Sequence, residues 1–107
     1  MPHRWTDEGV TVESAFTGAH LLHLAVAGCV LNDLYREAGS LDIALNGVRV
    51  TADGDFDRET WQSTGITYAI ELDSDAEPEA LHALVTRVDE VAEIPKTLRQ
   101  TARVSRG

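Results

Sequence analysis

The feature of this sequence that most restricts its fold is the stretch from Ala19 to Ala38, AHLLHLAVAGCVLNDLYREA. Its composition predicts a helix whose apolar side chains fall on nearly every face rather than in one stripe. Such a helix must be buried, because an exposed face would carry polar residues. The small residues Ala25, Ala27 and Gly28 would let another element approach the backbone closely, and Gly39 is expected to end the helix.

Alternation of apolar and polar residues predicts the strands. A short strand is expected over Gly9–Phe16, and the most regular alternation covers Ile66–Leu72. Between Leu41 and Asp53 the alternation changes phase at Asn46-Gly47, which predicts a bulge or turn there, and a polar connection from Asp53 to Gln62 follows. A last strand is expected through Leu98, Ala102 and Val104.

A second helix is predicted from Pro78 to about Glu93. It opens with acidic residues and an early proline, its apolar residues recur at helical spacing, and Pro95 is expected to end it. Strands and helices do not alternate strictly, so we expect an α+β fold in which an antiparallel or mixed sheet carries helices on one face. With 107 residues, the chain is expected to form a single domain over 1–107.

A monomer of this kind leaves its central helix incompletely covered. One sheet of about four short strands covers only one side of a helix that is apolar all round. A two-fold partner would cover the other side, and small domains gain most from such burial. We therefore expect a homodimer with the helix 19–38 buried at the interface.

The charge of the chain restricts its partners. Nine Lys and Arg residues against eighteen Asp and Glu give a formal net charge of −9, which argues against nucleic acid or an anionic membrane surface. The longest apolar stretch, Leu21–Leu31, is interrupted by His23 and is shorter than the ~20 residues that span lipid. The polar, acidic N-terminus resembles no signal or transit peptide, so a cytoplasmic location is expected.

Cys29 is the only cysteine and the only candidate nucleophile. A single cysteine cannot close an intramolecular disulfide, and in an apolar helix it is often simply a small buried side chain. Reactivity would require a thiolate stabilised by a cation. Asp33, one turn further along the helix, would raise the thiol pKa. Arg36, two turns on, could neutralise Asp33 or reach a thiol across a subunit interface.

Other polar groups predict sites only weakly. His20 and His23 have the i, i+3 spacing of a metal pair, but no further ligand can be assigned, and hydrogen-bonded interface histidines are the favoured interpretation. Asp53, Asp55 and Asp57 begin like a calcium loop, yet the required glycine and glutamate are replaced, which favours a solvated hairpin loop. No metal and no cofactor are therefore expected. Two aromatic residues of this loop could act as a lid over a pocket or as a dimer anchor: Phe56 and Trp61.

Residues 19–104 resemble the OsmC/Ohr family of organic hydroperoxide resistance proteins. The first half of the resemblance is a cysteine within an Ala/Gly-rich helix (Leu21-Leu22, Ala25, Ala27-Gly28-Cys29), followed by Gly39 and a Val48-x-Val50 strand. The second half is the stretch Ile94-Pro95-Lys96-Thr97-Leu98. At this place the family has a Cys-Pro step followed a few residues later by Thr-Leu. The resemblance implies an intertwined homodimer and the thiol-dependent reduction of organic hydroperoxides.

In that family two cysteines act, and Cys29 matches the first, peroxidatic one. The second, resolving position is Ile94 here, and the family's glutamate falls at Ala19 or His20. The family also uses an arginine from its N-terminal strands, and Arg4 is the only Lys or Arg in the shortened region 1–18.

Two functions follow from these residues. The first is a one-cysteine, thiol-dependent organic hydroperoxide reductase, in which Cys29 reacts, a small-molecule thiol resolves the sulfenic acid, and Arg4 or Arg36 is the candidate activating cation. The second is a catalytically degenerate homodimer that binds a small hydrophobic or acyl ligand at the subunit interface. The first requires a cation near an accessible sulfur, whereas the second requires only a pocket.

Overall fold

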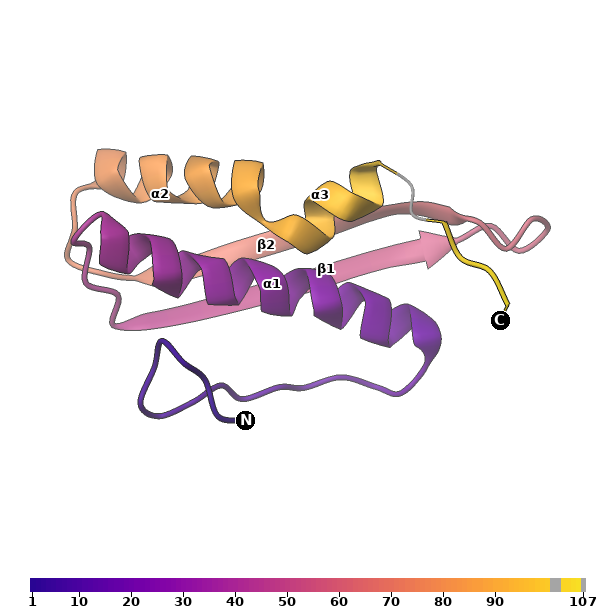
Figure 1. Ribbon diagram of the computed structural model, residues 1–107, viewed down its shortest axis with the longest axis horizontal. Coiled ribbons are helices and arrows are strands. Elements are labelled where there is room, and N and C mark those ends of the chain that lie inside the picture. The colour runs from indigo at the N-terminus through magenta and orange to yellow at the C-terminus, as the bar shows by residue number, and fades with distance from the viewer. Residues whose placement is uncertain (101–102, 107) are drawn as a thin grey trace.

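The structure, a computed structural model, describes residues 1–100 and 103–106 and places the helices on one face of a β-hairpin (Figure 1). The elements follow in the order α1 (Gly18–Ser40), β1 (Gly47–Phe56), β2 (Ser63–Asp73), α2 (Pro78–Val91) and α3 (Glu93–Arg99). The α+β class expected from the sequence is confirmed. The sheet has two antiparallel strands within the described residues, whereas the sequence pattern predicted about four.

Helix α1 confirms the helix predicted from Ala19 to Ala38. Thr17 caps its start, because its side chain accepts a hydrogen bond from the backbone N–H of His20. The expectation that Gly39 ends the helix is wrong, since the helix continues to Ser40. The backbone N–H of Ile43 then donates to the carbonyl of Ala38 at 2.9 Å and turns the chain.

That turn explains why the first half of the predicted strand at Leu41–Asp53 is absent. Asp42 adopts a left-handed conformation with φ of 57°, and the chain reaches the sheet only at Gly47. The phase change at Asn46-Gly47 therefore marks the start of β1 instead of a bulge inside a strand. The register irregularity lies further along, between Asp55 and Phe56, so part of the predicted polar connection belongs to the strand.

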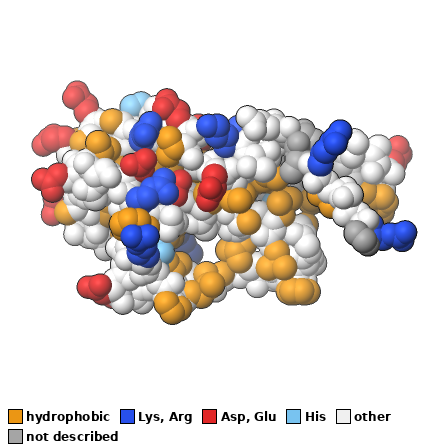
Figure 2. Space-filling view, viewed as in Figure 1, with side chains coloured by type: hydrophobic (Ala, Val, Ile, Leu, Met, Phe, Trp, Pro, Cys, Tyr) orange, Lys and Arg blue, Asp and Glu red, His pale blue; other side chains and the backbone are white. Residues whose placement is uncertain are grey.

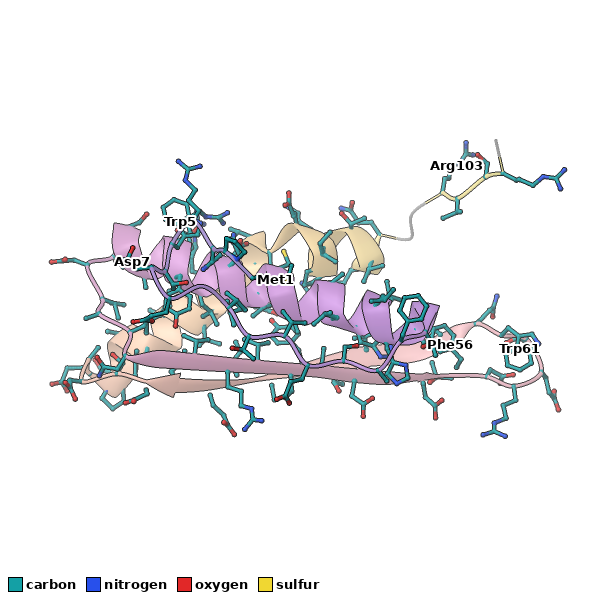
Figure 3. All side chains as sticks on the ribbon, turned by 90° about the horizontal axis from the view of Figure 1, so that it is seen from below. Met1, Trp5, Asp7, Phe56, Trp61 and Arg103 are labelled. Carbon is teal, nitrogen blue, oxygen red and sulfur yellow. The ribbon has the colours of Figure 1, made fainter. Side chains whose placement is uncertain are left out.

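The hairpin has one apolar and one polar face. The alternation predicted for Ile66–Leu72 is confirmed within β2, which pairs with β1 from Gly47 opposite Asp73 to Phe56 opposite Ser63. Figure 3 shows the side chains of the outer face pointing away from the helices. These exposed side chains are mostly polar or charged: Arg49, Thr51, Asp53, Asp55, Thr67, Glu71 and Asp73.

The core lies between α1 and the helices that follow the sheet. Val30 and Leu34 of α1 and Leu84 and Val88 of α2 are fully buried, and inward side chains of both strands pack against them. The amphipathic pattern predicted for α2 is therefore confirmed. Cys29 packs at the edge of this core.

The chain after α2 differs from the prediction. Helix α2 ends at Val91 because Ala92 takes an extended conformation, with ψ of 116°. Pro95 does not end that helix. It lies in the first turn of α3, where a proline costs no hydrogen bond. The predicted last strand is wrong at Leu98, which belongs to α3; Ala102 lies outside the described residues, and Val104 has no regular structure.

The strand predicted at Gly9–Phe16 is also absent. These residues are extended and run beside α1, but no backbone hydrogen bond pairs them with β1 among the described residues (Figure 1). Val10 and Val12 instead face a groove over α1. No helix of the described part of the chain is long and apolar enough to cross a membrane.

Candidate functional site

Cys29 lies in the middle of α1 and is partly buried. Its sulfur faces the first turn of α3, where the backbone N–H groups of Ile94 and Glu93 stabilise the thiolate form. Ile94 is also the position at which the family resemblance placed the missing second cysteine. The fold therefore brings this position to the thiol, although the two residues are far apart in sequence.

The thiol is nevertheless held in its protonated form. Burial raises the pKa of Cys29, and the nearby negative charges of Asp33 and Glu93 raise it further, against the lowering effect of the two backbone N–H groups. Asp33 is itself buried, and its carboxylate pairs with Arg36 at 3.2 Å and accepts a hydrogen bond from Asn32. At neutral pH the sulfur is therefore a weak nucleophile within this subunit.

The two candidate cations do not stabilise the thiolate within the subunit. Arg36 pairs with Asp33 and approaches Glu37 at 4.0 Å. The guanidinium of Arg4 lies over the ring of Trp5, 4.9 Å from its centroid. Neither contributes to the charges that set the pKa of Cys29. The role of Arg36 across a subunit interface stays a prediction, as does the role of Arg4 as an activating cation.

An apolar pocket lies one to two turns before Cys29 on α1. Its volume is about 260 Å³, and it is bounded by α1, the start of β2 and α3. Val26 and Leu22 precede Cys29 by three and seven residues, so they continue its stripe on the helix. We call this the α1–β2–α3 pocket, and its lining is mostly apolar: Leu22, Val26, Ser63, Gly65, Ile66, Tyr68, Pro95, Leu98 and Arg99.

The polar edge of this pocket was missed by sequence reasoning. The hydroxyl of Tyr68 donates to the carboxylate of Asp89, which also pairs with Arg99 at 2.9 Å. Burial and this carboxylate raise the pKa of Tyr68 to about 12. Arg99 is the last residue of α3. Tyr68, Asp89 and Arg99 thus come from β2, α2 and α3, and no sequence spacing relates them.

The weaker sequence candidates have structural roles here. The ring of His20 contacts Thr17 at 2.6 Å, and His23 is buried against the ring of Phe56. Asp57 accepts hydrogen bonds from two backbone N–H groups of the hairpin loop, which lower its pKa. In the ranges 1–100 and 103–106, no three His, Cys, Asp or Glu side chains gather closely enough to hold a metal ion. Trp61, also in the loop, is 73% exposed.

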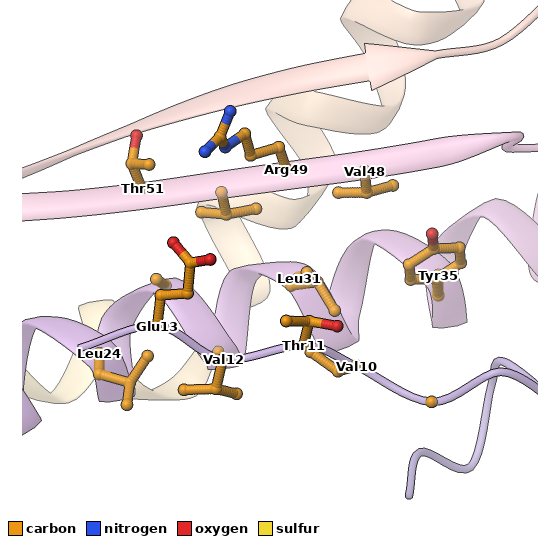
Figure 4. Close-up of a pocket in the computed structure, with 14 residues that line it drawn as sticks. Val10, Thr11, Val12, Glu13, Leu24, Leu31, Tyr35, Val48, Arg49 and Thr51 are labelled. Atoms are coloured by element: carbon orange, nitrogen blue, oxygen red, sulfur yellow. The ribbon is translucent and has the colours of Figure 1, made fainter. Parts of the chain in front are cut away.

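A second, larger groove of about 440 Å³ separates the extended N-terminal segment from the hairpin. Figure 4 shows Leu24, Leu31 and Tyr35 of α1 around it, with Val10 and Val12 of the segment. It lies on the flank of α1 that neither α2 nor α3 covers. This groove and the α1–β2–α3 pocket are thus separate features.

A long central helix that carries one cysteine, packed on a hairpin and followed by two shorter helices, defines an OsmC-type α+β protein. Residues 11–105 match the OsmC family, described as OsmC-like protein, and the chain belongs to that family. The family expected from the sequence is therefore confirmed.

Solved structures show the same fold. The crystal structure of an OsmC-like protein from Mycoplasma pneumoniae has a TM-score of 0.73 and 16% identity, with 81% of this chain and 64% of that chain covered. An OsmC-like hydroperoxide resistance protein from a Jannaschia species has a TM-score of 0.67 and 20% identity, with 84% and 64% covered. This chain thus spans less than two thirds of their length. No curated protein matches the sequence significantly.

Proposed function

We propose that this OsmC-like chain binds a small hydrophobic or acyl ligand in the α1–β2–α3 pocket. The observation that carries the proposal is the mostly apolar lining, contributed by three separate elements and closed on one side by Pro95 and Leu98 of α3. Its volume of about 260 Å³ lies just below the range of about 300–1,000 Å³ for ligand pockets, which suits a short chain or one ring.

Ligand binding is favoured over catalysis because of the state of the thiol. A thiol-dependent reductase needs a thiolate, and in this subunit burial and Asp33 raise the pKa of Cys29. Binding requires only an apolar wall that a ligand can cover and so remove from water, and the pocket offers such a wall.

Peroxide reduction is the second candidate, and the backbone N–H groups of Ile94 and Glu93 support it because they stabilise a thiolate at Cys29. The sulfur would attack the O–O bond of an organic hydroperoxide, form a sulfenic acid and release an alcohol. Since Ile94 offers no thiol, a small external thiol would condense with the sulfenic acid, release water and leave a mixed disulfide. A second thiol would then regenerate Cys29. The Jannaschia protein's description as a hydroperoxide resistance protein agrees with this chemistry.

We also propose that two copies of the chain pack against each other through α1. Its exposed stripe contains Leu21, Ala25 and Gly28, and Leu21 is 44% exposed. Figure 2 shows hydrophobic side chains gathered over the N-terminal half of α1 and the adjacent extended segment, whereas charged side chains gather at the opposite end. An apolar surface of this kind is typical of an interface.

Ligand binding is tested by calorimetric titration with decanoic acid. Replacing Leu22 with Trp fills the pocket, and Leu41→Trp is the matched control because Leu41 is 50% exposed and outside the pocket. We expect saturable binding by the native chain and the control, and at least about tenfold weaker binding by the filled variant, as loss of a hydrophobic pocket implies. Absence of saturable binding, or equal affinity in both variants, would refute the proposal.

Thiol chemistry is tested by intact mass after exposure to cumene hydroperoxide, with and without a small thiol. A reductase gains one oxygen on Cys29 or, with thiol present, a mixed disulfide, and Cys29→Ser gains neither. An unchanged mass at neutral pH excludes the second candidate and leaves the binding proposal untouched.

The dimer is tested by light scattering during size-exclusion chromatography. A side chain added at Gly28 would meet nothing within 4 Å in its own subunit, and the same holds at Gly39. Gly28→Leu should therefore give a folded monomer, while Gly39→Leu stays dimeric. A native chain that elutes as a monomer would contradict the proposed assembly.

A further inference from the structure

One arginine places a positive charge at the edge of the α1–β2–α3 pocket. Arg99 is the last residue of α3, and in the described part of the chain it is the only charged side chain that lines this pocket. Its side chain is 53% exposed, whereas Pro95 and Leu98 of the same helix belong to the apolar wall. The pocket therefore combines an apolar wall with one cationic group that water can reach.

The guanidinium of Arg99 is held in place by Asp89 of α2. Its Nη1 donates to the backbone carbonyl of Asp89 at 3.1 Å, and its Nη2 donates to the carboxylate at 2.9 Å. The hydroxyl of Tyr68 donates to the same carboxylate. Burial and this carboxylate raise the pKa of Tyr68 to about 12, so the phenol keeps its proton at neutral pH. These contacts join α3 to α2 and β2 and fix the charge relative to the pocket.

The guanidinium still has hydrogen-bond donors to offer. It carries five N–H groups, and Asp89 accepts from two of them. If the neighbouring oxygen of Tyr68 is counted as a third acceptor, two N–H groups still have no protein acceptor among residues 1–100 and 103–106. A carboxylate forms stronger hydrogen bonds with such groups than a neutral oxygen does, and its two oxygens suit the planar fork of arginine.

The surrounding charge limits the strength of such a contact. The pair of Arg99 and Asp89 is neutral as a whole, and water screens a side chain that is half exposed. The chain also has a net charge of −9, which repels anions at a distance. A free carboxylate would therefore gain little here, whereas a carboxylate attached to an apolar tail is held beside Arg99 by the burial of that tail.

We propose that Arg99 determines the specificity of this pocket and that the ligand is a monocarboxylic acid with an apolar tail. The carboxylate binds the free N–H groups of Arg99, and the tail covers Leu22 and Val26 of α1. The inference rests on the proposed binding function and adds to it the chemical class of the ligand and the residue that selects it. A neutral molecule with the same tail covers the same wall but makes no ionic contact with Arg99.

The contact is tested by NMR titration of the full chain at pH 7 with two ligands of equal chain length. Octanoic acid is ionised at this pH, as carboxylic acids ordinarily are, and octan-1-ol is neutral. The amide resonances of Gly65 and Ile66, which line the pocket, report the Kd of each ligand. We expect Arg99→Gln to weaken octanoate binding at least about threefold, as loss of a partly screened ion pair implies, and to change octan-1-ol binding by less than about 1.5-fold.

Two further variants separate a local contact from a general effect of charge. Lys96→Gln removes the other cation of α3, which lies outside the pocket, and should leave both Kd values at the native level. Arg99→Lys keeps the charge and should restore part of the octanoate affinity.

The outcomes distinguish this inference from the binding function on which it rests. Equal weakening of both ligands by Arg99→Gln would show that Arg99 only holds α3 in place, and unchanged octanoate binding would show that the carboxylate does not contact it. Either result overturns the inference and leaves the binding function standing. Absence of saturable binding of both ligands by the native chain would overturn the binding function and this inference with it.

Discussion

The hairpin leaves no room for a side chain beside α1 at Gly54, and replacing this residue with alanine tests the packing that holds the N-terminal half of α1. A Cβ at this position would lie 2.5 Å from the carbonyl oxygen of Gly65 and 2.9 Å from Nε2 of His23. One obstacle is backbone of the neighbouring strand and the other is a buried ring, so neither can move aside freely. Gly54 is thus required for space, since its φ is not in the left-handed region.

The expected cost follows from these two contacts. Inserting a methyl group into a well-packed interior destabilises by about 1–3 kcal/mol, and the lower chain entropy of alanine returns about 0.4–1 kcal/mol. A net loss of roughly 1–2 kcal/mol should lower Tm by about 4–8 °C for each kcal/mol in a domain of this size. Thermal unfolding followed by circular dichroism measures it directly.

Gly47→Ala is the matched control, because it lies on the same strand and its added Cβ would meet Asp73 at an ordinary 3.7 Å. It should be neutral or slightly stabilising. Gly54→Ala should cost less in a His23→Ala background than in the native chain, since one of the two contacts is then removed. If Gly54→Ala is as stable as Gly47→Ala, α1 does not pack against the hairpin in this way.

Three further substitutions test the site and the core. Asp33→Asn should lower the thiol pKa of Cys29 and speed its alkylation at pH 7, because it removes a negative charge beside the sulfur; an unchanged rate would contradict this electrostatic interpretation. The hydrogen bond from Tyr68 is the main cause that lowers the pKa of Asp89. The carboxylate therefore stabilises the fold above the ordinary aspartate pKa of about 4, and this contribution is lost as the pH falls through the lower pKa of the folded state. Asp89→Asn should accordingly make the free energy of unfolding depend less on pH at acidic pH. The same change should lower the pKa of Tyr68 from about 12 in an ultraviolet titration, and a constant value would show that the contact is not formed in solution. Leu34→Ala should cost about 3–5 kcal/mol in denaturant unfolding, since Leu34 is fully buried, and a loss below about 1 kcal/mol would place it outside the core.

Sequence reasoning succeeded where a pattern is repeated over many residues. The apolar stretch at 19–38 determines α1, the alternation at Ile66–Leu72 determines β2, and the spacing after Pro78 determines α2. In each case local periodicity and burial favour the same structure, and no distant residue has to be known. The family resemblance also depended on such local features, above all on Cys29 within a helix rich in small residues.

Short segments were predicted less well, because tertiary contacts decide them. Gly9–Phe16 alternates like a strand, yet strand pairing needs a neighbour. Here the segment follows a loop that the hydrogen bond from Val10 to Met1 closes and that His3 joins to Asn32 of α1. Leu98 was assigned to a strand, but the extended conformation of Ala92 ends α2 and is followed by a new helix, in which Pro95 fits the first turn.

The amino-acid sequence by itself determined the class of the fold, the long helix and the residue that carries the sulfur. Only the tertiary structure decided what surrounds that sulfur: the N–H groups of α3, the buried charge of Asp33 and the apolar pocket before it. The physical reason is that local periodicity records which face of an element is buried, whereas a pKa or a pocket depends on side chains from several elements that no spacing along the chain relates.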